Sequence, residues 1–175
     1  MTTNASTLLP IANAYWVIPN QLLAGEYPAF IGTPDAVQRL NAFLDAGITL
    51  FLDLTVAGEY DAPDYGPLLQ ELGEQRAKKV YHVRYPIRDM HAPSLEVMRD
   101  IQQTLKLAFA QGEVVYVHCF GGIGRTGTVI GCFLAEQGSS GKAAIAKLAR
   151  MRRGIPSANR KSPETRSQRA MVEKW

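Results

Sequence analysis

The chain has 175 residues, of which 46% are hydrophobic and 20% are charged, a composition typical of one soluble globular domain. Its two cysteines are too few for a disulfide framework, and no apolar run reaches the roughly 18 residues that a membrane-spanning helix needs. The first residues lack the basic and apolar regions of a secretory signal, so we expect a cytoplasmic protein in a reducing compartment.

Short apolar runs alternate along the chain with helical patterns. The predicted strands cover residues 15–17, 21–24, 48–54, 80–85 and 113–117. Helices are predicted over residues 33–46, with Thr33 as the capping residue, and over 67–78, 94–108, 126–137 and 142–152, with a last helix starting near Pro163. This alternation predicts an α/β fold, with a mostly parallel central sheet flanked by helices. We expect one domain over residues 1–175, with residues 1–13 flexible.

The most informative segment is residues 114–127, VVYVHCFGGIGRTG. A predicted buried strand ends at His118, a glycine-rich loop follows, and an apolar helix comes next. Ligands bind beyond the carboxyl ends of parallel strands, and inward-pointing amides at a helix N-terminus form an anion-binding nest. Such a nest would favour the thiolate form of Cys119, the nucleophilic form. Arg125, at the far end, can hold two phosphate oxygens in a bidentate fork.

Three alternatives compete for this segment. The glycine spacing of residues 122–127 also fits a dinucleotide-binding fingerprint, but it comes late in the chain and Glu136 is the only acid nearby. A Walker loop would need a lysine where Arg125 stands. Cys119 could also be a small buried hydrophobe, which is the expected role of Cys132 in its apolar helix.

The pattern His118-Cys119-x5-Arg125-Thr126-Gly127 resembles the signature of the protein tyrosine phosphatase superfamily, and the small size resembles its dual-specificity branch. Weaker matches extend the resemblance over about residues 15–172. Residues 23–28 resemble the strand and loop that border the pocket in this family. Residues 86–93 resemble the loop that bears the general acid, and residues 162–168 resemble the C-terminal segment that completes the site.

The resemblance implies how phosphate would be held. Cys119 would attack phosphorus and form a phosphocysteine, while the Arg125 side chain would clamp the equatorial oxygens. Further phosphate contacts would come from backbone amides of the loop: Phe120, Gly121, Gly122, Ile123, Gly124 and Arg125. In this account the phosphate loop, residues 119–125, joins the last core strand to a helix.

The resemblance also implies roles for four residues around the loop. Asp89 would protonate the leaving oxygen and then activate water. Thr126 would hydrogen-bond the cysteine sulfur and help it leave. His118 would fix the loop through backbone hydrogen bonds, and Gln168 would position the water.

The chemistry of the acid favours Asp89 independently, because an acid outside the nest keeps its proton away from the thiolate. Its loop, residues 86–93, is bracketed by prolines and follows a strand, which suits a positioned catalytic group. The rivals are Asp53, in a predicted buried strand, and Asp61 or Asp64, in a turn-rich loop. Asp89 could also be an ordinary loop aspartate.

These patterns predict a cysteine-dependent phosphatase of phosphate monoesters, of the protein-tyrosine or dual-specificity type. The phosphate loop holds no lysine or histidine, whereas members of this family that act on polyanionic lipids, inositol phosphates or RNA often carry them there. A phosphorylated protein or peptide, carrying phosphotyrosine and also phosphoserine or phosphothreonine, is therefore the expected substrate. A phosphatase of a non-protein ester and a phosphate-binding module without turnover are the alternatives.

The pattern indicates no cofactor and no metal site, since the three histidines are scattered, and it indicates no nucleic-acid or membrane partner. Nothing in it indicates an oligomeric state. The basic C-terminal segment, residues 142–175, carries ten Lys/Arg and two Asp/Glu, a net charge of +8, whereas residues 1–141 carry nine and fourteen, a net charge of −5. This segment is either a solvated helix face or, if the site lies nearby, a positive field that draws anionic substrates.

Overall fold

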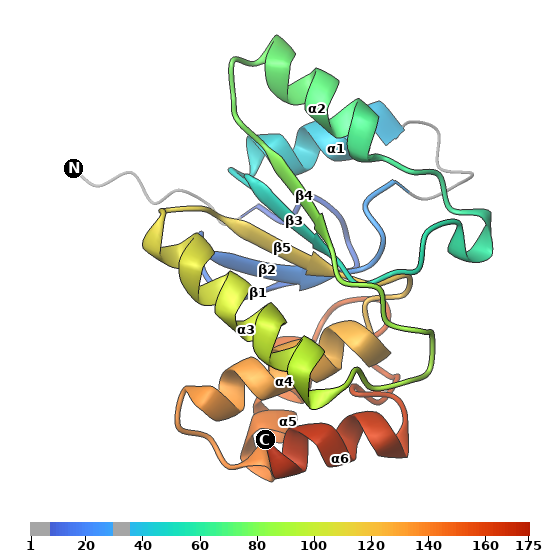
Figure 1. Cartoon of the computed structure of the whole chain (residues 1–175), viewed down its shortest axis with the longest axis vertical. Coiled ribbons are helices and arrows are strands. Elements are labelled where there is room, and N and C mark those ends of the chain that lie inside the picture. The colour runs from blue at the N-terminus through green and yellow to red at the C-terminus, as the bar shows by residue number, and fades with distance from the viewer. Residues whose placement is uncertain (1–7, 30–35) are drawn as a thin grey trace.

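A single twisted sheet forms the centre of the computed structural model, which describes residues 8–29 and 36–175 (Figure 1). Its strands within these residues are β1 (Ala14–Ile18), β2 (Leu22–Gly25), β3 (Leu50–Asp53), β4 (Tyr81–Arg84) and β5 (Val115–His118), in the spatial order β1-β2-β5-β3-β4. β1 pairs antiparallel with β2, and the other neighbours pair in parallel. The predicted mostly parallel α/β sheet is confirmed.

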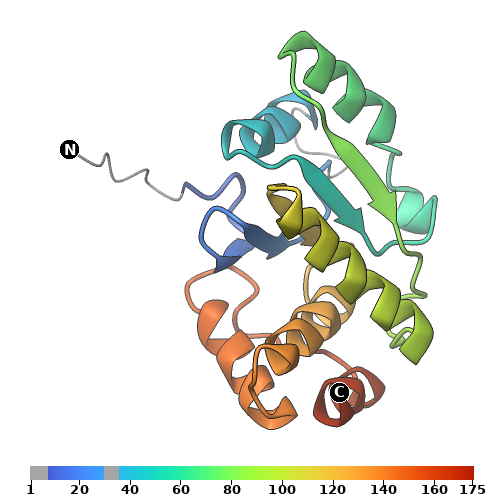
Figure 2. The same cartoon turned by 60° about the vertical axis from the view of Figure 1, so that its left-hand side comes forward.

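Helices cover both faces of the sheet (Figures 1 and 2). They are α1 (Ala36–Asp45), α2 (Gly66–Gln75), α3 (Leu95–Ala110), α4 (Gly124–Glu136), α5 (Gly141–Met151) and α6 (Arg166–Lys174), with a short 3-10 helix, η1 (Glu59–Asp61). Alternate side chains of each strand face opposite layers. In β5, Tyr116 packs in the cluster with α1 and α2, whereas Val115 and Val117 pack in the cluster with α3 to α6.

The ends of four strands meet at one edge of the sheet. His118 is level with Gly25 of β2 on one side and with Asp53 of β3 on the other, and Asp53 is level with Arg84 of β4. The loops that follow these strands therefore lie close together. Because ligands of open α/β sheets bind at this edge, the fold places a candidate site there.

The starts of the last helix and of α4 differ from the sequence prediction by two or three residues. The expected helix start at Thr33 lies outside the described residues. The last helix begins at Arg166, after a capping box in which Thr165 and Gln168 bond to each other's backbone N–H. α4 begins at Gly124, two residues earlier than expected, so the clamp arginine of the phosphate loop already belongs to a helix.

Residues near the N-terminus pack against the body of the domain. Ile11 is buried, and Asn13 donates to the carboxylate of Glu26 at 2.9 Å and accepts from the backbone N–H of Ser157 at 3.1 Å. Ile11 and Asn13 therefore pack against the fold, within the segment 1–13 that the sequence predicts to be flexible; residues 1–7 of that segment lie outside the described residues. None of the helices in the described part of the chain is long and apolar enough to cross a membrane.

Candidate active site

Cys119 follows β5 directly and lines a pocket of about 260 Å³. The cysteine itself is 2% exposed, so its sulfur is reached only through this pocket. The lining residues come from four loops and the start of α4: Tyr60, Asp89, Met90, Cys119, Phe120, Gly121, Ile123, Gly124, Arg160 and Glu164. The pocket thus brings together the phosphate loop, the loop of Asp89, η1 and the basic C-terminal segment.

The path of the phosphate loop depends on glycine at one position. Gly122 has a φ of 68°, and a Cβ there would lie 2.4 Å from the carbonyl carbon of Gly25 and 2.6 Å from the backbone nitrogen of Glu26. Only glycine allows the loop to press against the end of β2 in this conformation. The loop then enters the N-terminus of α4, where backbone N–H groups lack helical partners and the helix dipole favours an anion.

His118 is buried beneath this loop. Its Nδ1 lies 3.1 Å from the carbonyl oxygen of Cys119, and its Nε2 lies 2.6 Å from the hydroxyl of Tyr65. Because a carbonyl can only accept, Nδ1 carries the proton and Nε2 accepts from Tyr65. Burial lowers the pKa of His118, so the ring is neutral at neutral pH. The bond to the carbonyl oxygen of Cys119 ties the ring to the start of the phosphate loop, and the loop-structuring role stays a prediction.

Arg125 is buried, and its guanidinium pairs with the carboxylate of Glu59. Nη1 donates to Glu59 at 2.7 Å and to the carbonyl oxygen of Ile87 at 3.0 Å, and Nη2 donates to Glu59 at 2.5 Å. Nη2 also lies 3.0 Å from Oδ1 of Asp89. Burial alone would lower the pKa of Arg125, but Glu59, with Cys119 and Asp89 nearby, raises it above its ordinary value.

Glu59 was not singled out by the sequence analysis. Its side chain is 10% exposed, and η1 turns it toward Arg125 from a loop 66 residues earlier in the chain. The only available signal was indirect: a buried arginine needs an opposite charge, and the turn-rich loop after β3 was rich in acids.

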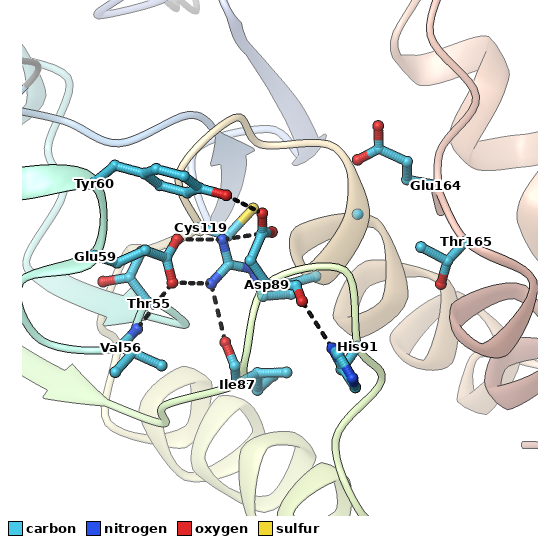
Figure 3. A network of polar contacts seen from close by, with 12 residues as sticks. Thr55, Val56, Glu59, Tyr60, Ile87, Asp89, His91, Cys119, Glu164 and Thr165 are labelled. Carbon is cyan, nitrogen blue, oxygen red and sulfur yellow. Dashed lines mark hydrogen bonds and ion pairs between the residues drawn. The ribbon is translucent and has the colours of Figure 1, made fainter.

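Asp89 lies at the mouth of the pocket, with both carboxylate oxygens engaged. Oδ1 pairs with Arg125, and Oδ2 accepts a hydrogen bond from the hydroxyl of Tyr60 at 2.6 Å. The loop that carries Asp89 is anchored to β3, because the backbone N–H of Ile87 donates to the carbonyl oxygen of Leu54 at 3.1 Å. The predicted general acid is therefore beside the predicted nucleophile and clamp (Figure 3).

The rival aspartates do not reach the pocket. Asp53 is fully buried and accepts hydrogen bonds from Thr55, His82 and Arg84. Burial would raise the pKa of Asp53, but the neighbouring His118 and the bonds from His82 and Thr55 hold it well below its ordinary value. Among the described residues, Asp89 is the only aspartate that lines the pocket; Asp61 and Asp64 do not.

Comparison with known proteins agrees with this geometry. The family model of the Swiss Army Knife DSP-PTPase phosphatase domain (PTP-SAK) matches residues 11–172. The chain belongs to the dual-specificity branch of the protein tyrosine phosphatase superfamily. "Putative tyrosine phosphatase 067L" of Invertebrate iridescent virus 3 is 32% identical over 127 residues, which cover 70% of this chain and 45% of the viral protein. Protein tyrosine phosphatase domain-containing protein 1 of Mus musculus is 31% identical over 101 residues, 54% of this chain and 13% of the mouse protein.

The phosphatase domain thus spans less than half the length of these two relatives. Solved structures share its fold. Tk-PTP in the active form superposes with a TM-score of 0.72 at 23% identity, over 93% of this chain and 95% of Tk-PTP. PTPMT1 in complex with PI(5)P superposes with a TM-score of 0.67 at 22% identity, over 89% of each chain. At these identities the likeness concerns the fold alone.

Thr126 of the phosphatase does not make the predicted bond to sulfur. Its hydroxyl is buried and has no hydrogen-bond partner among residues 8–29 and 36–175. Because α4 begins at Gly124, Thr126 lies in the first helical turn, and the helical backbone sets the direction of its side chain.

Gln168 makes hydrogen bonds that the sequence did not predict. Its Oε1 accepts from the backbone N–H groups of Glu164 and Thr165 at 3.1 and 2.9 Å, and its Nε2 donates to the carbonyl oxygen of His91 at 3.2 Å. Both ends of the buried amide are therefore occupied, and Gln168 does not line the pocket. These bonds tie the loop of Asp89 to the start of α6 and use one of the two N–H donors of Nε2. The role of Gln168 in positioning water stays a prediction.

The basic C-terminal segment reaches the pocket of the phosphatase. Arg160 and Glu164 line the pocket and form an ion pair. Buried Arg152 donates to the carbonyl oxygen of Arg160 at 2.8 Å, and the hydroxyl of Ser162 donates to the carbonyl oxygen of Ile123 at 2.7 Å. These contacts attach the segment to the phosphate loop. Because the basic segment lies at the site, the interpretation as a positive field that draws anionic substrates is favoured over that of a solvated helix face.

Proposed function

We propose that this domain hydrolyses phosphate monoesters through a phosphocysteine intermediate on Cys119. The observation that carries the proposal is the placement of Cys119 and Arg125 at the two ends of one glycine-rich loop, with Arg125 oriented by Glu59. Both cysteines are free, and a reducing compartment keeps such thiols reduced, which supports a cytoplasmic location.

In the first step, the phosphate dianion binds the phosphate loop and the guanidinium of Arg125. The Cys119 thiolate attacks phosphorus, the bond between phosphorus and the leaving oxygen breaks, and Asp89 gives its proton to that oxygen. The products of this step are the free alcohol or phenol and a phosphocysteine. Asp89 suits the role because it lines the pocket beside both groups.

In the second step, water attacks the phosphocysteine. Asp89, now a carboxylate, takes a proton from the water, the bond between sulfur and phosphorus breaks, and inorganic phosphate leaves. The thiolate is regenerated, so no cofactor or external oxidant is required.

We further propose phosphoproteins as substrates, with phosphotyrosine first and phosphoserine or phosphothreonine second. The apolar side chains of Tyr60, Phe120 and Met90 in the pocket lining suit an aryl group, and the phosphate loop lacks lysine and histidine. A non-protein ester is the alternative, and PTPMT1, a protein of the same fold, was solved with PI(5)P. A phosphate-binding module without turnover would be expected to lack the thiol, the arginine or the acid.

The proposal is tested by assaying wild type, Cys119→Ser and the matched control Cys132→Ser on phosphopeptides, phosphoinositides and nucleotides. Cys119→Ser should lose nearly all turnover while still binding vanadate, because a serine hydroxyl does not ionise as a thiol does. Cys132→Ser should keep it. Turnover above about a tenth of wild type in Cys119→Ser would contradict the nucleophile assignment, since loss of the nucleophile removes most of the acceleration. Faster hydrolysis of phosphoinositides than of phosphopeptides would overturn the proposed substrate class.

The acid is tested with Asp89→Asn and the matched control Asp61→Asn. Asp89→Asn should lower the turnover of phosphopeptides by about 10²- to 10⁴-fold, or roughly 3 to 5 kcal/mol of barrier. The defect should shrink for aryl phosphates with acidic leaving groups, which need no proton. Leaving-group dependence in Asp61→Asn instead would move the acid to the loop after β3.

A further inference from the structure

The donors of Arg125 are almost fully used before substrate arrives. A guanidinium has five N–H donors. Nη1 donates to Glu59 and to the carbonyl oxygen of Ile87, and Nη2 donates to Glu59. Nη2 also lies 3.0 Å from Asp89. Nε is buried and has no hydrogen-bond partner in the described chain. A phosphate held in a bidentate fork needs two neighbouring donors, and Nε with Nη2 is the pair that Glu59 leaves open. Phosphate binding on this side therefore takes Nη2 away from Asp89.

Asp89 has a second partner that phosphate does not take. The hydroxyl of Tyr60 donates to Oδ2 of Asp89 at 2.6 Å (Figure 3). The Tyr60 ring packs on Phe120 with centroids 4.7 Å apart. The bond to Asp89 raises the pKa of Tyr60, so the phenol keeps its proton at neutral and mildly alkaline pH and remains a donor.

We propose that Tyr60 is a positioning residue for the general acid, Asp89. When bound substrate occupies Arg125, Oδ1 of Asp89 loses its partner, and the hydrogen bond from Tyr60 to Oδ2 keeps the carboxyl group at the pocket. The inference rests on the proposed function, in which Asp89 is that acid. A phosphate dianion on Arg125 repels an ionised Asp89, whose side chain is 36% exposed and could otherwise turn away into solvent. With Oδ2 held by Tyr60, Oδ1 carries the proton that passes to the leaving oxygen.

The backbone of η1 supports a functional role for this tyrosine. Tyr60 has φ 53° and ψ 34°, and Asp61 also has a φ of 53°, so two successive non-glycine residues are left-handed. This conformation costs about 1 to 2 kcal/mol per residue and is found disproportionately at functional sites. The same turn directs Glu59 at Arg125 and Tyr60 at Asp89, so it holds the clamp and the acid together.

The test uses Tyr60→Phe, which removes the hydroxyl and keeps the ring against Phe120. With phosphate esters that have poor leaving groups, kcat should fall by about tenfold, which corresponds to about 1.4 kcal/mol, the upper end of what one hydrogen bond between neutral groups contributes. KM should change by less than about twofold, because the clamp is intact. With an aryl phosphate whose leaving group is acidic, kcat should stay near wild type, which also reports that the variant is folded.

The matched control is Tyr85→Phe, which removes a hydroxyl bonded to Thr104 at 2.7 Å, outside the pocket lining. It should leave both kcat values unchanged. In the Asp89→Asn background, Tyr60→Phe should cause no further loss if Tyr60 acts through Asp89.

Three outcomes would overturn the inference. Tyr60→Phe could match wild type on poor leaving groups, it could change KM alone, or its loss could multiply with that of Asp89→Asn. A normal Tyr60→Phe together with an inactive Cys119→Ser would refute the positioning role and leave the phosphatase assignment intact. A normal Asp89→Asn would refute both the general acid and its positioning residue.

Discussion

Replacing Glu59 by glutamine tests whether the buried carboxylate orients the phosphate clamp. Glu59 is 10% exposed and bonds both terminal nitrogens of Arg125, whose side chain is 1% exposed, at 2.7 and 2.5 Å. Glutamine has nearly the same shape but no charge and only one acceptor oxygen. Glu59→Gln therefore removes half of the fork and all of the opposite charge without creating a cavity.

The size of the effect follows from what remains around Arg125. Breaking a buried ion pair by removing one partner costs about 3 to 5 kcal/mol. Here the amide keeps one bond, and Asp89 and the carbonyl oxygen of Ile87 both stay 3.0 Å from the guanidinium. We therefore expect a loss of about 2 to 3 kcal/mol, or about 5 to 10 °C in melting temperature for a domain of this size. Misalignment of the clamp should lower kcat/KM by about 10- to 100-fold.

The assay combines thermal unfolding with steady-state hydrolysis of an aryl phosphate. Glu26→Gln is the matched control, because Glu26 pairs with Arg39 at 3.0 Å outside the pocket, with both side chains 19% exposed. Water reaches both side chains of this pair and screens their charges, so we expect a contribution of about 1 kcal/mol. The control should melt closer to wild type than Glu59→Gln and keep its activity. If Glu59→Gln behaves like Glu26→Gln in both measurements, the orientation of Arg125 does not depend on Glu59.

Three other results are expected. Arg125→Lys should be nearly as inactive as Arg125→Ala in steady-state assays, because an ammonium cannot form a planar two-oxygen fork. The pKa of Asp53 is lower in the folded chain than in the unfolded chain, where it is about 3.9. The ionised Asp53 therefore stabilises the fold above about pH 3.9, and this stabilisation is lost as the pH falls toward the pKa of the folded chain. Asp53→Asn should accordingly lower the urea midpoint at pH 7 and weaken its dependence on pH below about 4. Burial raises the pKa of Cys132 to about 12, so iodoacetamide at pH 8 should spare Cys132. The reagent should label Cys119, and vanadate should protect Cys119 from it. Equal labelling of the two thiols would contradict this expectation.

The phosphate loop could be predicted from sequence because its working parts are contiguous. A buried strand, a cysteine, glycines and an arginine follow one another over residues 114–127, and local geometry alone brings them to one anion site. Asp89 was also predictable, because its loop follows a strand of the same parallel sheet. Its carboxylate lies 3.0 Å from Arg125 at the shared edge.

Side-chain directions and partners from distant loops were not predictable in the same way. Thr126 has the expected sequence position, but the early start of α4 fixes its hydroxyl away from any partner in the described chain. Gln168 also has the expected position, but backbone groups nearby occupy its amide. Glu59 and Tyr60 lie in a loop without hydrophobic periodicity, so no pattern distinguishes them from neighbouring Asp61.

The order of the strands explains why Glu59 and Tyr60 matter. β3 lies between β5 and β4 in the sheet, and all three run in parallel, so their following loops leave the same edge side by side. The loop after β5 leads into α4 with Arg125, the proposed clamp, and the loop after β4 holds Asp89, the proposed acid. The loop after β3 emerges from the strand between them, and η1 on that loop contacts Arg125 with one residue and Asp89 with the next. The contacts of η1 with Arg125 and with Asp89 are therefore a consequence of sheet topology that no local sequence motif encodes.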